Sequence, residues 1–106
     1  MFVTSQGTAV GRFSRAIQKR LVFQAELAAR ELGQLPLGFA LDLVVLYAEV
    51  GDPKAERAAV RLLRRLLEER SVSLSEARRA ADWLEQLAGP EADLAAGSLS
   101  SLIHRR

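Results

Sequence analysis

The sequence predicts an all-α fold, a compact bundle of four to five short antiparallel helices. Apolar residues recur at steps of three and four over most of the chain, and no segment alternates as a strand would. Short turn signals separate these segments, and the sharpest is Gly51-Asp52-Pro53. Glycine can adopt the left-handed conformation that ends a helix, aspartate caps the next helix, and proline fits its first position. Similar signals at residues 33–36, 71–76 and 89–90 set the helix lengths.

Composition bounds the class of protein. With 106 residues, of which 49% are hydrophobic and 26% charged, the chain is suited to one folded domain rather than to disorder. We expect a flexible lead-in over residues 1–7 and a single helical domain over 8–106. The longest apolar run, residues 35–50, is interrupted by polar residues and is too short for a membrane span. Because there is no signal-peptide pattern, we expect a cytoplasmic protein.

The segment from Thr8 to Leu32 predicts helix with an apolar stripe. Thr8 is suited to cap the first helix and Gly33 to end the segment. One long helix, or two helices with a break near Arg20-Leu21, fit the pattern equally well. The stripe consists of Phe13, Ile17, Leu21, Ala25, Ala28 and Leu32.

The segment over about residues 37–50 is apolar on nearly every side, which predicts a central helix packed by its neighbours. Its polar residues Gly38, Asp42 and Glu49 share one narrow ridge. We therefore expect Asp42 to be exposed to solvent. The alternative is a buried salt bridge to an arginine of a neighbouring helix.

Residues 53–70 predict an amphipathic helix. Its expected inner face is Ala55, Ala59, Leu62, Leu63, Leu66 and Leu67, and its expected outer face is Lys54, Arg57, Arg61, Arg64, Arg65 and Glu68.

The next helix begins at Ser73, with Glu76 three residues later as a capping box, and its expected inner face is Ala77, Ala80, Ala81, Leu84 and Leu87. The last segment, 91–106, has helical spacing at Leu94, Ala95, Leu99, Leu102 and Ile103 but contains Gly97-Ser98. It either docks loosely on the bundle or becomes ordered against a partner.

Residues 40–56, ALDLVVLYAEVGDPKAE, resemble one tetratricopeptide repeat. That family places a Tyr on its first helix, Gly-Asp at the turn and Lys-Ala at the start of its second helix, and Tyr47, Gly51, Asp52, Lys54 and Ala55 follow this order. The turn is one residue shorter than in the repeat. The resemblance implies hairpin packing of the tetratricopeptide type and protein–protein binding. The whole chain also resembles short helical proteins of high-GC actinobacteria, a bacterial likeness that implies no activity.

No residue pattern predicts catalysis or a cofactor. Ser100 and Ser101 lie one helical turn before His104, as a nucleophile and its base could, but no carboxylate follows to orient the imidazole. The chain has no cysteine and one histidine, so no ligand set for a metal is spaced along it. We therefore expect a protein that is not an enzyme and that carries neither metal nor cofactor.

The candidate residues are instead binding residues. Our leading expectation is a protein–protein interaction module whose partner is another protein or a second copy, with Trp83 and the outward arginines Arg57, Arg61, Arg64 and Arg65 as contacts. The alternative is a nucleic-acid-associated accessory protein. It would use the same arginines and a second basic cluster, Arg12, Arg15, Lys19 and Arg20.

Overall fold

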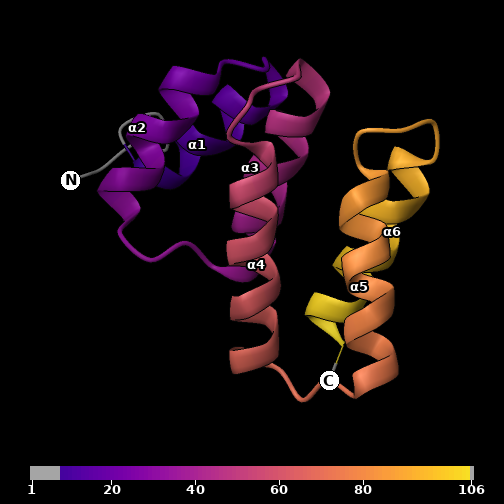
Figure 1. Ribbon diagram of the computed structural model, residues 1–106. Coiled ribbons are helices and arrows are strands. Elements are labelled where there is room, and N and C mark those ends of the chain that lie inside the picture. Colours follow the sequence, from indigo (N-terminus) through magenta and orange to yellow (C-terminus); the bar gives the residue numbers. More distant parts are fainter. Residues whose placement is uncertain (1–7, 106) are drawn as a thin grey trace. The chain divides into compact units, whose positions relative to one another are not determined.

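The computed structural model describes residues 8–105 and is all-α, so the predicted fold class is confirmed (Figure 1). The described residues form six helices and no strand: α1 (Ala9–Gln18), α2 (Val22–Leu32), α3 (Leu37–Val50), α4 (Ala55–Glu69), α5 (Leu74–Gln86) and α6 (Ala92–His104). The count of four to five is not confirmed, chiefly because the segment 8–32 divides in two. The predicted lead-in, residues 1–7, lies outside the described residues. No described helix is long and apolar enough to cross a membrane.

The chain divides into two compact units, Met1–Pro36 and Leu37–Arg106. In the described part of the first unit, α1 and α2 form a helical hairpin. The Thr8 hydroxyl accepts a hydrogen bond from the N–H of Gly11 at 3.0 Å, as predicted for an N-cap. Arg20 then adopts a left-handed conformation with φ of 57°, and the N–H of Leu21 donates to the carbonyl of Ala16. Because of this turn, the segment from Thr8 to Leu32 forms two helices rather than one long helix.

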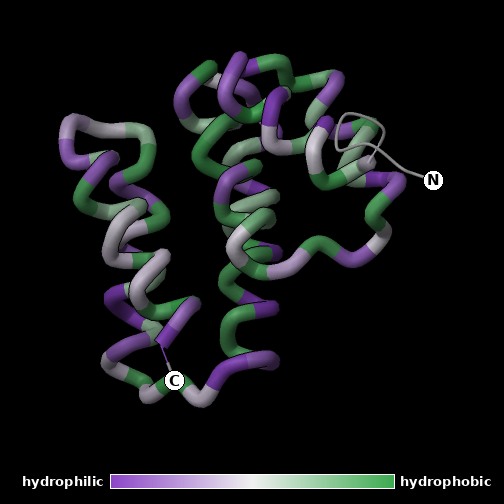
Figure 2. Tube along the Cα trace, turned by 180° about the vertical axis from the view of Figure 1, so that it is seen from behind, coloured by the Kyte–Doolittle hydropathy of each residue, from purple (hydrophilic) through white to green (hydrophobic). Residues whose placement is uncertain are grey.

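The second unit is a bundle of α3 to α6. Helix α3 packs against α4 and α6, and α5 packs against α4 and α6, so each helix of the bundle has two neighbours. The predicted central helix, α3, has five buried residues, more than any other described helix. The tube in Figure 2 is mostly hydrophobic along α3 and alternates along α4. Helix α6 docks through three buried residues of its second half, Leu99, Leu102 and Ile103. The largest fully buried side chains of this unit are Leu46, Leu66, Leu99 and Ile103.

The turn between α3 and α4 follows its sequence signals closely. Gly51 has φ of +69° and ends α3, and the Asp52 carboxylate accepts the N–H of Lys54 at 2.8 Å. Helix α4 is regular from Ala55 rather than from Pro53, because Pro53 and Lys54 form a turn that leads into it. The Lys54 ammonium also lies 5.6 Å from the centre of the Tyr47 ring, a cation–π contact that joins the two helices.

The last turn of α6 is held by polar contacts between the ends of helices. The predicted capping box is present: the Ser73 hydroxyl accepts from the N–H of Glu76, and the Glu76 carboxylate accepts from the N–H of Ser73. The same carboxylate pairs with the guanidinium of Arg105. In addition, Arg70 Nε donates to the carbonyl of Ile103 at 2.8 Å. These contacts fix the last turn of α6 to the α4–α5 connection.

One residue that was predicted to face inward is exposed: Leu67 of α4 is 47% exposed. Leu94 of α6, predicted only to have helical spacing, is 71% exposed. In α4 the buried residues are Ala58, Leu62 and Leu66, which recur every four positions. A face with this spacing is rotated toward Ala58, so Leu67 falls on its edge rather than within it.

Candidate interaction surfaces

The first candidate surface is an apolar groove between α4 and α5, which lie side by side in Figure 1. Its volume is about 170 Å³. We name it the α4–α5 groove, and its lining is Glu56, Ala59, Val60, Leu63, Ala81, Leu84 and Glu85. Short alanine side chains keep the groove open, while the two glutamates stand at the end where the helices are furthest from their connection.

The α4 wall of this groove continues as an exposed apolar stripe. Val60 is 56% exposed and Leu67 is 47% exposed, with the half-buried Leu63 between them. Positions 60, 63 and 67 are spaced by three and four residues, so they lie on one face of the helix. Helix α4 therefore carries two apolar faces, one packed in the bundle and one open to solvent.

Charged residues border the stripe and the groove on both outer sides. On α4 the exposed residues beyond the stripe are Arg57, Arg61, Arg64 and Glu68, which we call the α4 rim. On α5 the exposed charged residues at the edge of the groove and beyond it are Glu85, Asp82 and Arg78, which we call the α5 rim. Within residues 8–105, none of these seven side chains makes a hydrogen bond or ion pair.

The fourth predicted arginine of α4 is engaged within the chain. Arg65 Nε donates to the Glu69 carboxylate at 2.8 Å, one helical turn further on. This hydrogen bond lowers the pKa of the Glu69 carboxyl below its ordinary value. Arg65 thus stands apart from the three arginines of the α4 rim.

Trp83 is not brought together with these arginines. It is half-buried on the side of α5 that faces α6. There it lines a shallow depression of about 400 Å³ with Arg79, Ser98, Ser101 and Leu102, among others. The expected binding residues therefore divide between two surfaces of the second unit.

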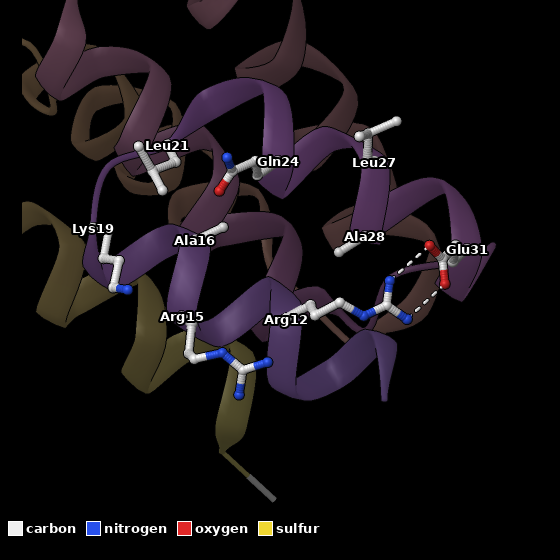
Figure 3. A pocket seen from close by; sticks show the side chains of 9 residues that line it. All are labelled: Arg12, Arg15, Ala16, Lys19, Leu21, Gln24, Leu27, Ala28 and Glu31. Atoms are coloured by element: carbon white, nitrogen blue, oxygen red, sulfur yellow. Dashed lines mark hydrogen bonds and ion pairs between the residues drawn. The ribbon is translucent and has the colours of Figure 1, made fainter. Parts of the chain in front are cut away.

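The second candidate surface is a cleft between α1 and α2, shown in Figure 3. We name it the α1–α2 cleft; its volume is about 290 Å³. Three of the four predicted basic residues, Arg12, Arg15 and Lys19, line it from α1, and Arg20 does not. The remaining lining residues are Ala16, Leu21, Gln24, Leu27, Ala28 and Glu31.

Arg12 is tied across this cleft to α2. Both of its terminal nitrogens donate to the Glu31 carboxylate at 2.8 Å, a two-point ion pair that Figure 3 draws as dashed lines. The Arg12 hydrogen bond lowers the pKa of the Glu31 carboxyl, and Glu31 raises the pKa of Arg12 in turn. Arg12 therefore braces the hairpin.

The only histidine lies at the end of α6, next to α3. A Cβ atom placed on Gly38 would come within 3.1 Å of His104 Nε2, so the imidazole lies against the α3 backbone. The nearby Asp42 is exposed, as predicted, yet partial desolvation raises the pKa of its carboxyl while the charge of His104 acts to lower it. The structure thus supplies a carboxylate near His104 that sequence order did not reveal.

Ser100 and His104 are not arranged as a nucleophile and its base. His104 Nδ1 lies 2.9 Å from the Ser100 carbonyl oxygen and 3.4 Å from its hydroxyl. A carbonyl can only accept, so Nδ1 carries the proton and donates it to that oxygen. A protonated Nδ1 cannot take a proton from the hydroxyl. Among the described residues, no group of three or more His, Asp or Glu could hold a metal ion.

Comparison with protein-family models, with curated proteins and with solved structures finds no match for this chain.

Sequence reasoning missed the exposed stripe on α4, although the signal was present. Val60, Leu63 and Leu67 have helical spacing of their own, offset from the buried face by part of a turn. Two apolar stripes on one helix indicate two packing partners, and only one of them is needed by the bundle.

Proposed function

We propose that this protein is a small non-enzymatic helical interaction module that pairs with a second copy of itself through the α4–α5 groove and its stripe. The observation that carries the proposal is the exposed stripe at Val60, Leu63 and Leu67 beside an apolar groove, with unpaired charges on both rims. Exposed apolar patches with a polar border are typical of protein-binding surfaces.

The order of charges favours a second copy as the occupant. Helices α4 and α5 run antiparallel, and the groove is lined by Val60 and Leu63 from α4 and by Ala81 and Leu84 from α5. Along α4 the rim reads positive at 57, 61 and 64 and negative at 68. At matching levels along α5 the rim reads negative at 85 and 82 and positive at 78.

The charges of the α4 rim and of the α5 rim are complementary when α4 of one copy covers α5 of the other. A two-fold axis parallel to the helices produces this arrangement and repeats it on the other side, as an isologous dimer requires. Arg61 and Arg64 then face Glu85 and Asp82 of the other copy, and Glu68 faces Arg78. A two-fold axis across the helices would instead place α4 over α4, with arginines facing arginines.

The tetratricopeptide-like hairpin supports the same role. Residues 40–56 span the α3–α4 turn, and α4 is the helix that carries the stripe. The resemblance implies a scaffold that binds protein rather than a catalyst. We propose hairpin packing of that type for α3 and α4.

The test is the molar mass of the purified chain by sedimentation equilibrium. We expect a dimer, and we expect Val60→Glu to convert it to monomer because a charge would be buried at the centre of the interface. Leu94→Glu is the matched control, since it places the same charge at an exposed apolar residue of α6, away from the groove. A wild-type monomer at millimolar concentration would refute the proposal.

A charge exchange tests the orientation. Arg61→Glu and Glu85→Arg should each weaken the dimer, because each places like charges opposite one another. The double variant should restore most of the lost affinity. If the double variant is weaker than both single variants, the parallel arrangement is wrong.

A further inference from the structure

The depression between α5 and α6 lies outside the surface that the proposed pairing uses. Two helices that pack together form it, and its volume of about 400 Å³ lies within the range of small-molecule sites. The ion pair between Glu76 and Arg105 belongs to its lining. Because this pair joins the start of α5 to the end of α6, the two helices run antiparallel along the depression (Figure 1).

The other polar residues of the lining follow in order from this ion pair. An α-helix rises about 1.5 Å per residue, so Arg79 lies about 4.5 Å along α5 from Glu76, and Trp83 lies about 10 Å along it. On α6, Ser101 and Ser98 lie about 6 Å and about 10 Å from the guanidinium member of the pair. A guanidinium and a hydroxyl thus come first, and an indole ring and a second hydroxyl follow.

Four of these polar side chains have hydrogen-bonding capacity that the protein does not use. Within residues 8–105, no hydrogen bond or ion pair is made by the side chains of Arg79, Trp83, Ser98 and Ser101. Guanidinium and indole N–H groups can only donate, and a hydroxyl can donate as well as accept. The depression therefore offers mainly donors, which suits a ligand that supplies acceptor oxygens.

The charge of the lining indicates which acceptor fits. Arg105 is paired with Glu76, so these two charges cancel and the charge of Arg79 is left over. One positive charge suits an anion with one negative charge, and a guanidinium fork matches the two oxygens of a carboxylate.

The lining also has apolar surface beside the donors. Trp83 is half-buried, so part of its ring is open to a ligand, and the buried Leu102 adds aliphatic surface from α6. Aromatic groups pack favourably on an indole by offset stacking or edge-to-face contact. Arg79 and Trp83 are four residues apart and lie on one face of α5, about 6 Å apart along the helix.

We propose that this depression binds a small carboxylic acid that carries an aromatic group. Arg79 and the Ser101 hydroxyl hold the carboxylate. The aromatic group packs on the Trp83 ring, and a short aliphatic linker joins it to the carboxylate. The site lies on the α6 side of α5 and is independent of the pairing through the α4–α5 groove, so a monomeric chain would refute the pairing and leave this proposal standing.

The probe is 3-phenylpropionate, titrated into the full chain while tryptophan fluorescence and amide chemical shifts are followed. Trp83 is the only tryptophan of the chain, so the fluorescence signal reports on this depression. We expect a saturable change with a Kd on the order of 1 mM, because a shallow site covers only part of its ligand. If neither signal saturates by about 20 mM, the proposal is wrong.

One variant and its matched control test the role of the guanidinium. Arg79→Gln should weaken binding about tenfold, because it removes a charge-assisted hydrogen bond from an exposed residue that the fold does not need. Arg78→Gln removes the same charge from the next residue of α5, which does not line the depression, and should leave the affinity unchanged. Equal effects of the two variants would mean that only the overall charge attracts the acid, and would overturn the proposal.

Two related compounds separate the carboxylate from the ring. The neutral amide 3-phenylpropionamide should bind about tenfold more weakly than the acid, and Arg79→Gln should weaken it no further. Acetate keeps the charge without the ring and should bind more weakly than 3-phenylpropionate. If the amide binds as tightly as its acid, or acetate as tightly as 3-phenylpropionate, the depression does not recognise an aromatic acid.

A last comparison distinguishes a small acid from the end of a polypeptide. Acetyl-glycyl-glycyl-phenylalanine presents a ring and a free carboxylate at the end of a chain, whereas N-acetylphenylalanine presents them without the chain. We expect the peptide to bind no more tightly than N-acetylphenylalanine. If the peptide binds more tightly, the depression receives a polypeptide C-terminus and the small-acid proposal is wrong.

Discussion

The two units of this chain bury different kinds of residue. The hairpin of α1 and α2 buries Phe13 and three alanines, Ala16, Ala25 and Ala28, and it is braced by the exposed Arg12–Glu31 ion pair. The bundle of α3 to α6 buries a leucine-rich core instead. Small residues let two helices approach closely but remove little apolar area from water, and burial of apolar area is the main stabilising term.

This difference determines where each unit can present a site. In the hairpin, alanines between the helices leave a cleft, and charged side chains from α1 surround it. In the bundle, the core is filled, so the open apolar surface lies on the outside, on the second face of α4. The hairpin therefore presents a charged cleft, and the bundle presents an exposed apolar face.

The largest expected effect tests the contrast between the two cores. Leu66→Ala should lower the free energy of unfolding by about 2–5 kcal/mol, because Leu66 is 1% exposed and its removal leaves a cavity in the bundle. Ala28→Gly in the hairpin should cost about 2 kcal/mol or less, the sum of the helix propensity difference and the loss of one buried methyl group. Chemical denaturation followed by far-UV circular dichroism measures both.

The control for these variants is Leu94→Ala, which truncates an exposed leucine and should change stability by less than about 0.5 kcal/mol. If Leu66→Ala costs no more than Leu94→Ala, the bundle is not held by its leucine core. The contrast between the units would then fail.

Two glycines of the bundle, Gly97 and Gly38, should give stability changes of intermediate size when each is replaced by alanine. Gly97 lies inside α6 with open space around its Cβ position, so Gly97→Ala should stabilise the protein by about 1 kcal/mol. Gly38→Ala should gain less, because its new Cβ would meet His104 at 3.1 Å. Thermal unfolding of both variants measures the difference.

His104→Ala provides the control for this pair. In that background Gly38→Ala should gain as much as Gly97→Ala does, since the imidazole is gone. If Gly38→Ala remains the poorer variant without His104, the contact between α6 and α3 does not limit it.

Much of this fold was predictable because local signals determine it. The Thr8 cap, the Gly51-Asp52 turn and the Ser73–Glu76 capping box each depend on residues within four positions of one another. The break at Arg20 is different. The hydrogen bonds of the turn require a left-handed residue there, and the position is occupied by arginine rather than by glycine, so composition gave no firm indication of it.

The candidate sites were predictable only in part, because sites depend on which helices become neighbours. Spacing along α1 grouped Arg12, Arg15, Lys19 and Arg20, of which the first three line one cleft. The pairing of Arg12 with Glu31, however, joins residues that are 19 positions apart. The approach of Asp42 to His104 likewise depends on the docking of α6 against α3. Helical periodicity describes one helix at a time and contains no information about such contacts.

The smallest expected effect is a difference between the two units in how their stability depends on acidic pH. Arg105 and, second, the N–H of Ser73 hydrogen-bond to Glu76 and lower the pKa of its carboxyl from its ordinary 4.5 to about 2. A carboxyl with a lowered pKa stabilises the folded state above its unfolded value, and this stabilisation is lost as pH falls. The bundle should therefore lose stability between pH 4.5 and about 2 as the unfolded chain takes up one more proton than the folded chain.

Glu76→Gln should flatten the dependence of unfolding free energy on pH in that window. The Gln carbonyl can still accept the N–H of Ser73, so the cap is retained while the charge beside Arg105 is removed. Glu31→Gln is the matched variant in the hairpin, where Arg12 also lowers the pKa of the carboxyl. Denaturation at a series of pH values measures both slopes. Glu76 accepts hydrogen bonds from both a guanidinium and the N–H of Ser73 at a helix N-terminus. Glu76→Gln should therefore flatten the dependence of unfolding free energy on pH more than Glu31→Gln does. Equal slopes for the two variants would mean that the capping box adds nothing to the ion pair between Glu76 and Arg105.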